Sequence, residues 1–230
     1  QGKSTAFLNL NKGSVLDLGT QSLGNSRKTN ISITGNGYLK NTFGSWASIY
    51  NTDYGFNDGE INIEADNFYG TAPIFESNYK RISVNIKDVS INSGNGLFAY
   101  VTSPVGANIN INVDNIYSTS TATGGWPPGF IELGAAAGYP SSNSKLTVNI
   151  GNAEMNKRTG KLFTLGSPSE VSTNNSIVYN VGNFRQVNKD SLTDPYDPSI
   201  LDLGAFSFTN DDNSGTFTRI KTTLNCNNFV

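Results

Sequence analysis

Aromatic and acidic side chains concentrate in segments that interrupt the regular patterns of the chain. The candidate contact residues in or beside these segments are Trp46, Tyr50, Asp53, Tyr54, Asp58, Trp126, Glu132 and Tyr139. Aromatic rings can pack on the C–H face of a sugar while nearby carboxylates and amides bind its hydroxyl groups. These residues are therefore candidate carbohydrate-binding positions. A second interpretation stays open for each ring, namely that it only holds a long loop against the protein.

Catalytic chemistry on a glycan would need more than these contacts. Glycoside hydrolysis uses two carboxyl groups about 5–9.5 Å apart. The candidate carboxylates are those of Asp53, Asp58, Glu60, Glu64 and Glu132. No spacing along the chain singles out one pair among them. The catalytic residues therefore stay unassigned, and we expect a protein without enzymatic activity in preference to an enzyme.

The composition excludes several other kinds of site. The chain has no histidine, and Cys226 is its single cysteine, which excludes a Ser-His-Asp triad, an intrachain disulfide and zinc sites built on these residues. We therefore expect no metal site and no cofactor. A net charge of -2 and a pI near 5.1 argue against nucleic acid as a partner. No apolar run approaches the ~18 residues of a membrane span, so membrane insertion is not expected.

An eight-residue pattern recurs along the chain and is clearest at residues 109–116 (ININVDNI). It alternates apolar and polar residues over five positions, and then has two polar residues and one apolar residue. Further copies begin at residues 31, 61, 82, 146 and 177, and the seventh position is Asn or Asp in five of the six copies. A shorter pattern falls between these copies, as at residues 15–19 (VLDLG) and 130–134 (FIELG). The two patterns together make a repeating unit of two strands.

Alternation with a period of two indicates strands that bury one face. Because the copies recur every 21 to 37 residues without a helical pattern, they predict coils of parallel strands that stack on one another. We expect the seventh-position Asn or Asp to adopt a left-handed backbone at a tight turn. Stacked on one another, these side chains are expected to form an amide ladder. A β-sandwich or jelly roll fits the long insertions less well, and the leucine-rich repeat spacing is absent.

Residues 30–37 (NISITGNG), and the alternating segments followed by Gly-Asn or Asp-Asn, resemble right-handed parallel β-helices of the pectate-lyase-like superfamily. The resemblance covers about residues 13–204. Together with the repeats, it predicts an all-β fold, a right-handed parallel β-helix solenoid with about six to seven coils and long loop insertions. We expect one domain over residues 1–230, with residues 205–230 as a last coil or C-terminal cap. The lack of a capping helix at the N-terminal end predicts a truncated chain or a covering partner subunit.

This superfamily includes polysaccharide lyases, glycoside hydrolases, phage tailspikes and bacterial adhesins, so its fold does not select one activity. The absence of histidine and of a specific acid pair favours a structural or receptor-binding protein, similar to the β-helical parts of phage tail fibres and tailspikes. Such a protein would be a homotrimer, extracellular or on a virion surface, in contact with a cell-surface polysaccharide. Two alternatives stay open: a polysaccharide lyase or glycoside hydrolase acting as a depolymerase, and a bacterial surface adhesin.

Overall fold

The structure is a computed structural model that describes part of the 230-residue chain. The described residues are 4–18, 21–22, 29–42, 47–50, 58–71, 73–77, 79–91, 98–102, 104–118, 131–134, 141–156, 163–165, 172–187, 206–207, 217–218 and 221–229. All regular secondary structure in these segments is β-strand, as the alternating pattern predicts. The same segments hold no helix with the length and apolar character that crossing a bilayer requires.

The largest sheet contains ten strands among the described residues, and its strands pair in parallel. Its main path consists of β1 (Ser4–Leu10), β4 (Thr29–Gly35), β7 (Glu60–Gly70), β9 (Arg81–Ile91), β11 (Asn108–Ser118), β14 (Lys145–Asn156), β17 (Ser176–Val187) and β20 (Lys221–Phe229). Two short strands, β2 (Val15–Asp17) and β5 (Tyr38–Asn41), pair with each other, and β5 also pairs with β7. Because the path follows chain order, each long strand pairs with the next copy of the pattern.

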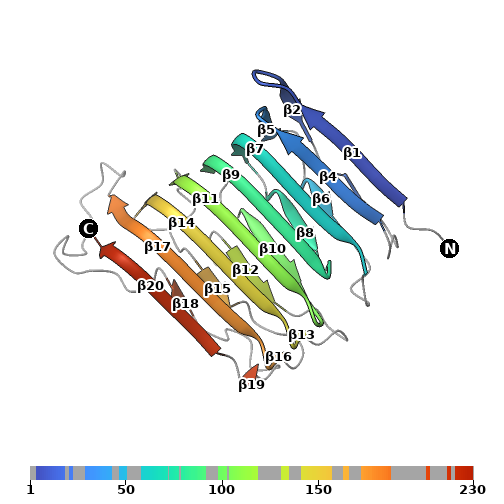
Figure 1. The fold of residues 1–230 in the computed structure, drawn as a ribbon. Coiled ribbons are helices and arrows are strands. Elements are labelled where there is room, and N and C mark those ends of the chain that lie inside the picture. Colours follow the sequence, from blue (N-terminus) through green and yellow to red (C-terminus); the bar gives the residue numbers. More distant parts are fainter. Residues whose placement is uncertain are drawn as a thin grey trace.

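Two further parallel sheets complete the described part. The second sheet consists of β3 (Gln21–Ser22), β6 (Ile49–Tyr50), β8 (Phe75–Ser77), β10 (Ala99–Thr102), β12 (Ile131–Gly134), β15 (Phe163–Leu165) and β18 (Phe206–Ser207). The third consists of β13 (Ser141–Ser142), β16 (Ser172–Thr173) and β19 (Phe217–Thr218). Figure 1 shows the largest sheet in front of the second, with β1 and β20 at its opposite edges. Repeated passage through the same sheets makes this a solenoid-like fold of stacked parallel strands.

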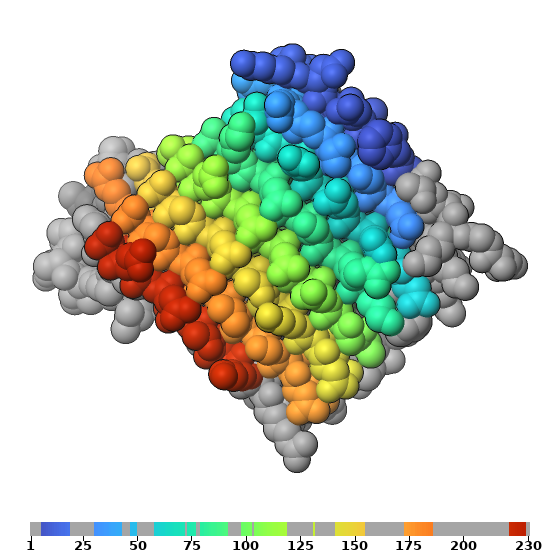
Figure 2. Space-filling model, viewed as in Figure 1, coloured from blue at the N-terminus to red at the C-terminus, as the bar shows by residue number. Residues whose placement is uncertain are grey.

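The buried face of the largest sheet is built from apolar rows that cross its strands. The first-position residues Ile61, Ile82, Ile109, Leu146 and Ile177 pair in register, and each is at most 2% exposed. Burying one such side chain contributes about 1.5–3 kcal/mol. The predicted buried face of the eight-residue pattern is therefore confirmed. Figure 2 shows the opposite, outer face, where side chains of successive strands follow one another in rows.

Four copies of the shorter pattern, at residues 74–76, 97–100, 130–134 and 162–166, contribute strands to the second sheet, and a further copy at residues 200–204 lies outside the described residues. Phe75, Ala99, Ile131 and Phe163 lie in register in β8, β10, β12 and β15. The copy at residues 15–19 was wrongly aligned with them. Its strand β2 pairs with β5 in the largest sheet, and the Asp17 carboxylate accepts a 3.3 Å hydrogen bond from the backbone N–H of Thr42.

The long strands continue through the seventh position, contrary to the prediction of a tight turn there. In β7, buried and exposed residues alternate up to Ala65, and then Asp66 and Asn67 are both partly exposed before the alternation resumes. Strand pairing skips Asp66 and the equivalent residues of other strands. One residue is skipped on both strands of each pair, so the strands bend here without ending and the register resumes unchanged. In the described residues, left-handed φ angles outside glycine occur at another corner, at Asn143 (51°) and Asn174 (55°).

The core position Tyr179 on β17 predicts sensitivity to alkali. Its side chain is 1% exposed, and burial raises the pKa of its hydroxyl well above the ordinary value of 10.0. Above pH ~10 the unfolded chain loses this proton while the folded chain keeps it, so stability falls as pH rises. We expect Tyr179→Phe to reduce that fall by up to about 1.4 kcal/mol per pH unit. Urea unfolding of both proteins at several alkaline pH values measures it, and identical slopes would contradict the prediction.

Candidate functional site

The structure describes few of the contact residues that the sequence predicts. Trp46, Asp53, Tyr54, Trp126 and Tyr139 lie outside the described residues. The backbones of Tyr50 and Glu132 lie on β6 and β12, but their side chains are not described. Glu132 is in register with Tyr100 of β10 and Thr164 of β15. Of the eight candidates, Asp58 is the one whose side chain is described.

Asp58 and its neighbour Glu60 take part in ion pairs between two coils. The Nζ of Lys80 lies 3.6 Å from Oδ1 of Asp58, and Nε of Arg81 donates a 2.6 Å hydrogen bond to Oε1 of Glu60. All four side chains are partly exposed, so each pair contributes about 0–1 kcal/mol. Both carboxylates had been considered for catalysis, and each forms an ion pair with a cation of the next coil.

Lys87 sits at the bend of β9 among carboxylates. Its Nζ lies 2.5 Å from Oδ1 of Asp66. The hydrogen bond and the charge of Asp66, with smaller contributions from Asp114 and Asp88, raise the pKa of Lys87. A base that takes a proton from a sugar must be deprotonated near the working pH, and these carboxylates keep Lys87 protonated. In the described segments, no three His, Cys, Asp or Glu side chains gather as a metal ion would require.

Two rows of amide side chains cross the outer face of the largest sheet. In the seventh-position row, which consists of Asp88, Asn115, Asn152, Asn183 and Asn228, each amide donates a 2.7–2.8 Å hydrogen bond to the preceding residue. The predicted amide ladder is therefore confirmed. A fourth-position row was not predicted. It consists of Asn85, Asn112, Asn149, Asn180 and Asn225, joined in the same way by 2.7–2.8 Å hydrogen bonds.

Three exposed tyrosines surround a hollow on the outer face beyond the bend. Tyr38, Tyr69 and Tyr117 are 43%, 38% and 47% exposed and line a cavity of about 400 Å³. We call this cavity the tyrosine hollow. Tyr69, Ser90 and Tyr117 pair in register on β7, β9 and β11, so the backbones that carry the two rings lie about 10 Å apart. The small Ser90 between them leaves the space open.

Polar groups complete the lining of the tyrosine hollow. They include Lys40, Asn67, Asp88 and Ser90. Asn67 is in register with Tyr38 on one side and with Asp88 on the other, so a polar row runs beside the row of rings. Aromatic walls with a few fixed polar groups suit a ligand that has both apolar faces and hydroxyl groups. A sugar has this combination.

Sequence reasoning missed these tyrosines because it looked for contact residues in the long insertions. The signal was an aromatic residue directly after the eighth position of the pattern, at Tyr69 and Tyr117. Both positions alternate with buried Phe68 and Ile116, so their side chains face outward.

Comparisons with known proteins add no relative to this picture. A scan against protein-family models, a search of curated proteins and a search of solved structures found no match to the chain. The functional argument therefore rests on the residues and geometry of the chain itself.

Proposed function

We propose that this protein is a non-enzymatic, receptor-binding β-helix of the phage tail fibre or tailspike type that contacts a cell-surface glycan. Its fold would be a right-handed parallel β-helix related to the pectate-lyase-like superfamily, on a virion surface or extracellular. The tyrosine hollow carries the proposal, because exposed rings held on paired strands form a rigid platform for sugar rings. The solenoid-like stack supports it by fixing the ring spacing through strand register.

The ion pairs of three described carboxylates and the raised pKa of Lys87 favour binding over cleavage. Asp58, Glu60 and Asp66 are each paired with a cation, and the pKa of Lys87 is raised. A depolymerase needs carboxyl groups or a base that can exchange protons. The enzyme stays the alternative function, and a chain-length analysis of incubated polysaccharide separates the two. Our proposal expects undiminished chain length, and shortening of the polysaccharide would overturn it.

The role of the hollow in binding is tested by Tyr117→Ala. Loss of one ring wall is expected to weaken binding of a recognised oligosaccharide about tenfold, equivalent to about 1.4 kcal/mol. Titration calorimetry measures the affinity. Phe7→Ala is the matched control, because Phe7 is a 68% exposed ring of the same sheet that does not line the hollow. Equal affinities of wild type and Tyr117→Ala would place the binding site elsewhere.

The homotrimer and the adhesin alternative are addressed by native mass. A fibre or tailspike is expected to be a trimer, whereas an adhesin of this fold is expected to be a monomeric rod. Light scattering of the purified chain measures the mass directly. A monomer would count against the fibre and tailspike type while leaving the glycan contact open to the calorimetric test.

A further inference from the structure

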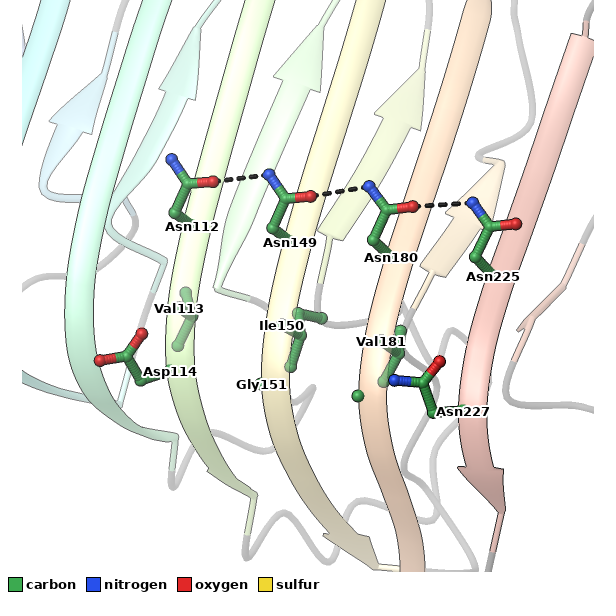
Figure 3. Close-up of a pocket in the computed structure, with 11 residues that line it drawn as sticks. Asn112, Val113, Asp114, Asn149, Ile150, Gly151, Asn180, Val181, Asn225 and Asn227 are labelled. Carbon is green, nitrogen blue, oxygen red and sulfur yellow. Dashed lines mark hydrogen bonds between the residues drawn. The ribbon is translucent and has the colours of Figure 1, made fainter.

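A second hollow lies along the bend of the four C-terminal long strands. It is a trough of about 650 Å³ lined by residues of β11, β14, β17 and β20. One side consists of the fourth-position amides of Asn112, Asn149, Asn180 and Asn225, which form an unbroken hydrogen-bonded row (Figure 3). The trough crosses three strand spacings, which gives a length of about 14 Å along the stacking direction.

Glycines at the bend open the middle of this trough. The bend position is occupied in turn by Asp114, Gly151, Gly182 and Asn227. The side chains of Asp114 and Asn227 stand at its two ends (Figure 3), and the two glycines between them have no side chain. In the preceding coils, paired Asp66 and Lys87 side chains occupy the same position, and the hollow there is only about 190 Å³. The trough is therefore local to the coils that carry glycine.

The amide row keeps hydrogen-bonding capacity for a ligand. A carboxamide has two N–H donors and an oxygen with two lone pairs. Asn149 uses one N–H towards Asn112 and one lone pair towards Asn180, and Asn180 is bonded in the same way between Asn149 and Asn225. Each central amide thus retains one donor and one acceptor lone pair. A hydroxyl group both donates and accepts, so a chain of hydroxyl-bearing units matches this row.

The charge of the trough selects among such ligands. Asp114 is its one titratable lining residue among the described residues, and no cation lines it. The cation that interacts with Asp114, Lys87 on β9, does not line the trough and is already paired with Asp66, so an anionic polymer would meet this carboxylate with little compensating positive charge. We propose that the trough binds a segment of an uncharged oligosaccharide that runs along the stacking direction, across β11 to β20. The trough shares no lining residue with the tyrosine hollow, so this site goes beyond the proposed function and does not require it.

Asn180→Ala tests the site, with Asn183→Ala as the matched control. Both side chains lie on β17 and make the same pair of ladder hydrogen bonds, but only Asn180 lines the trough. The variants are made in a Tyr69→Ala/Tyr117→Ala background, which removes the hollow as a source of binding. The probes are maltohexaose, cellohexaose, mannohexaose and chitohexaose, with hexagalacturonate as the anionic probe. Affinities are measured by NMR titration, and thermal melting checks that each variant is folded.

We expect at least one neutral probe to shift the backbone amides of Gly151 and Gly182. Asn180→Ala is expected to weaken its affinity about tenfold or more, while Asn183→Ala changes it by less than about twofold. Three results would overturn the site: no neutral probe binds in the double-tyrosine background, both asparagine variants lose affinity equally, or hexagalacturonate binds more tightly than every neutral probe. If Tyr117→Ala weakens oligosaccharide binding while a neutral probe still shifts the backbone amides of Gly151 and Gly182, the weakened binding belongs to the tyrosine hollow and not to the trough.

Discussion

Replacing Phe68 by alanine is expected to lower the free energy of unfolding by about 3–5 kcal/mol. Phe68 is 1% exposed and follows the bend of β7. Its ring meets the ring of Phe98 edge to face, with centroids 5.5 Å apart. Because Phe98 directly precedes β10, this contact joins the largest sheet to the second one. Removal of the ring leaves a cavity between two sheets that strand pairing holds in place, so little collapse can compensate.

Urea unfolding followed by circular dichroism measures this loss. Phe7→Ala is the control, since the Phe7 ring is largely exposed and its removal should change stability by no more than about 0.5 kcal/mol. A Phe68→Ala protein as stable as the Phe7→Ala protein would show that the two sheets do not share a packed core at this point.

Replacing Gly151 by alanine is expected to cost about 1–3 kcal/mol of stability. An added Cβ would lie 2.5 Å from the backbone carbonyl oxygen of Asp114 on the preceding strand. Gly182 meets the carbonyl oxygen of Gly151 in the same manner. Both contacts are with backbone atoms, which cannot rotate away. The strands would have to separate at the bend, where their pairing is already interrupted.

Thermal melting measures this effect, at about 2–4 °C for each kcal/mol in a chain of this size. Asp114→Ala provides the comparison, because Asp114 occupies the same bend position, already carries a Cβ and is exposed. Its melting temperature should stay within about 2 °C of wild type. An unchanged melting temperature for Gly151→Ala would contradict the close approach of β11 and β14.

The parallel sheets could be predicted because their signal is local and repeated. Alternation at residues 109–116 and its copies placed the buried rows correctly, as the register of Ile109 with Ile82 and Leu146 shows. The bend was interpreted as a turn because two successive polar residues are typical of both. Strand β20 was not recognised as a copy because Thr222 takes the place of the usual first-position aliphatic residue.

The ligand-facing features were harder to predict, since they depend on neighbours from other coils. Asn112 alone is one more polar residue on an exposed face, and only its pairing with Asn85 and Asn149 makes it part of a row. Likewise, Ser90 carries no signal until strand register places it between two tyrosines. Register between distant segments decides both features, and it stays the same from pair to pair while the insertions vary in length.

The most direct test of the account is a glycan array probed with the wild-type protein and with the Tyr69→Ala/Tyr117→Ala variant. We expect wild type to be retained on one or more cell-surface glycans, and we expect the variant to lose the signal on those that the tyrosine hollow binds while melting at the wild-type temperature. Retention of both proteins on the same glycans with equal signal would contradict a role for the tyrosine hollow. No retention of wild type on any glycan would contradict the glycan-binding function itself.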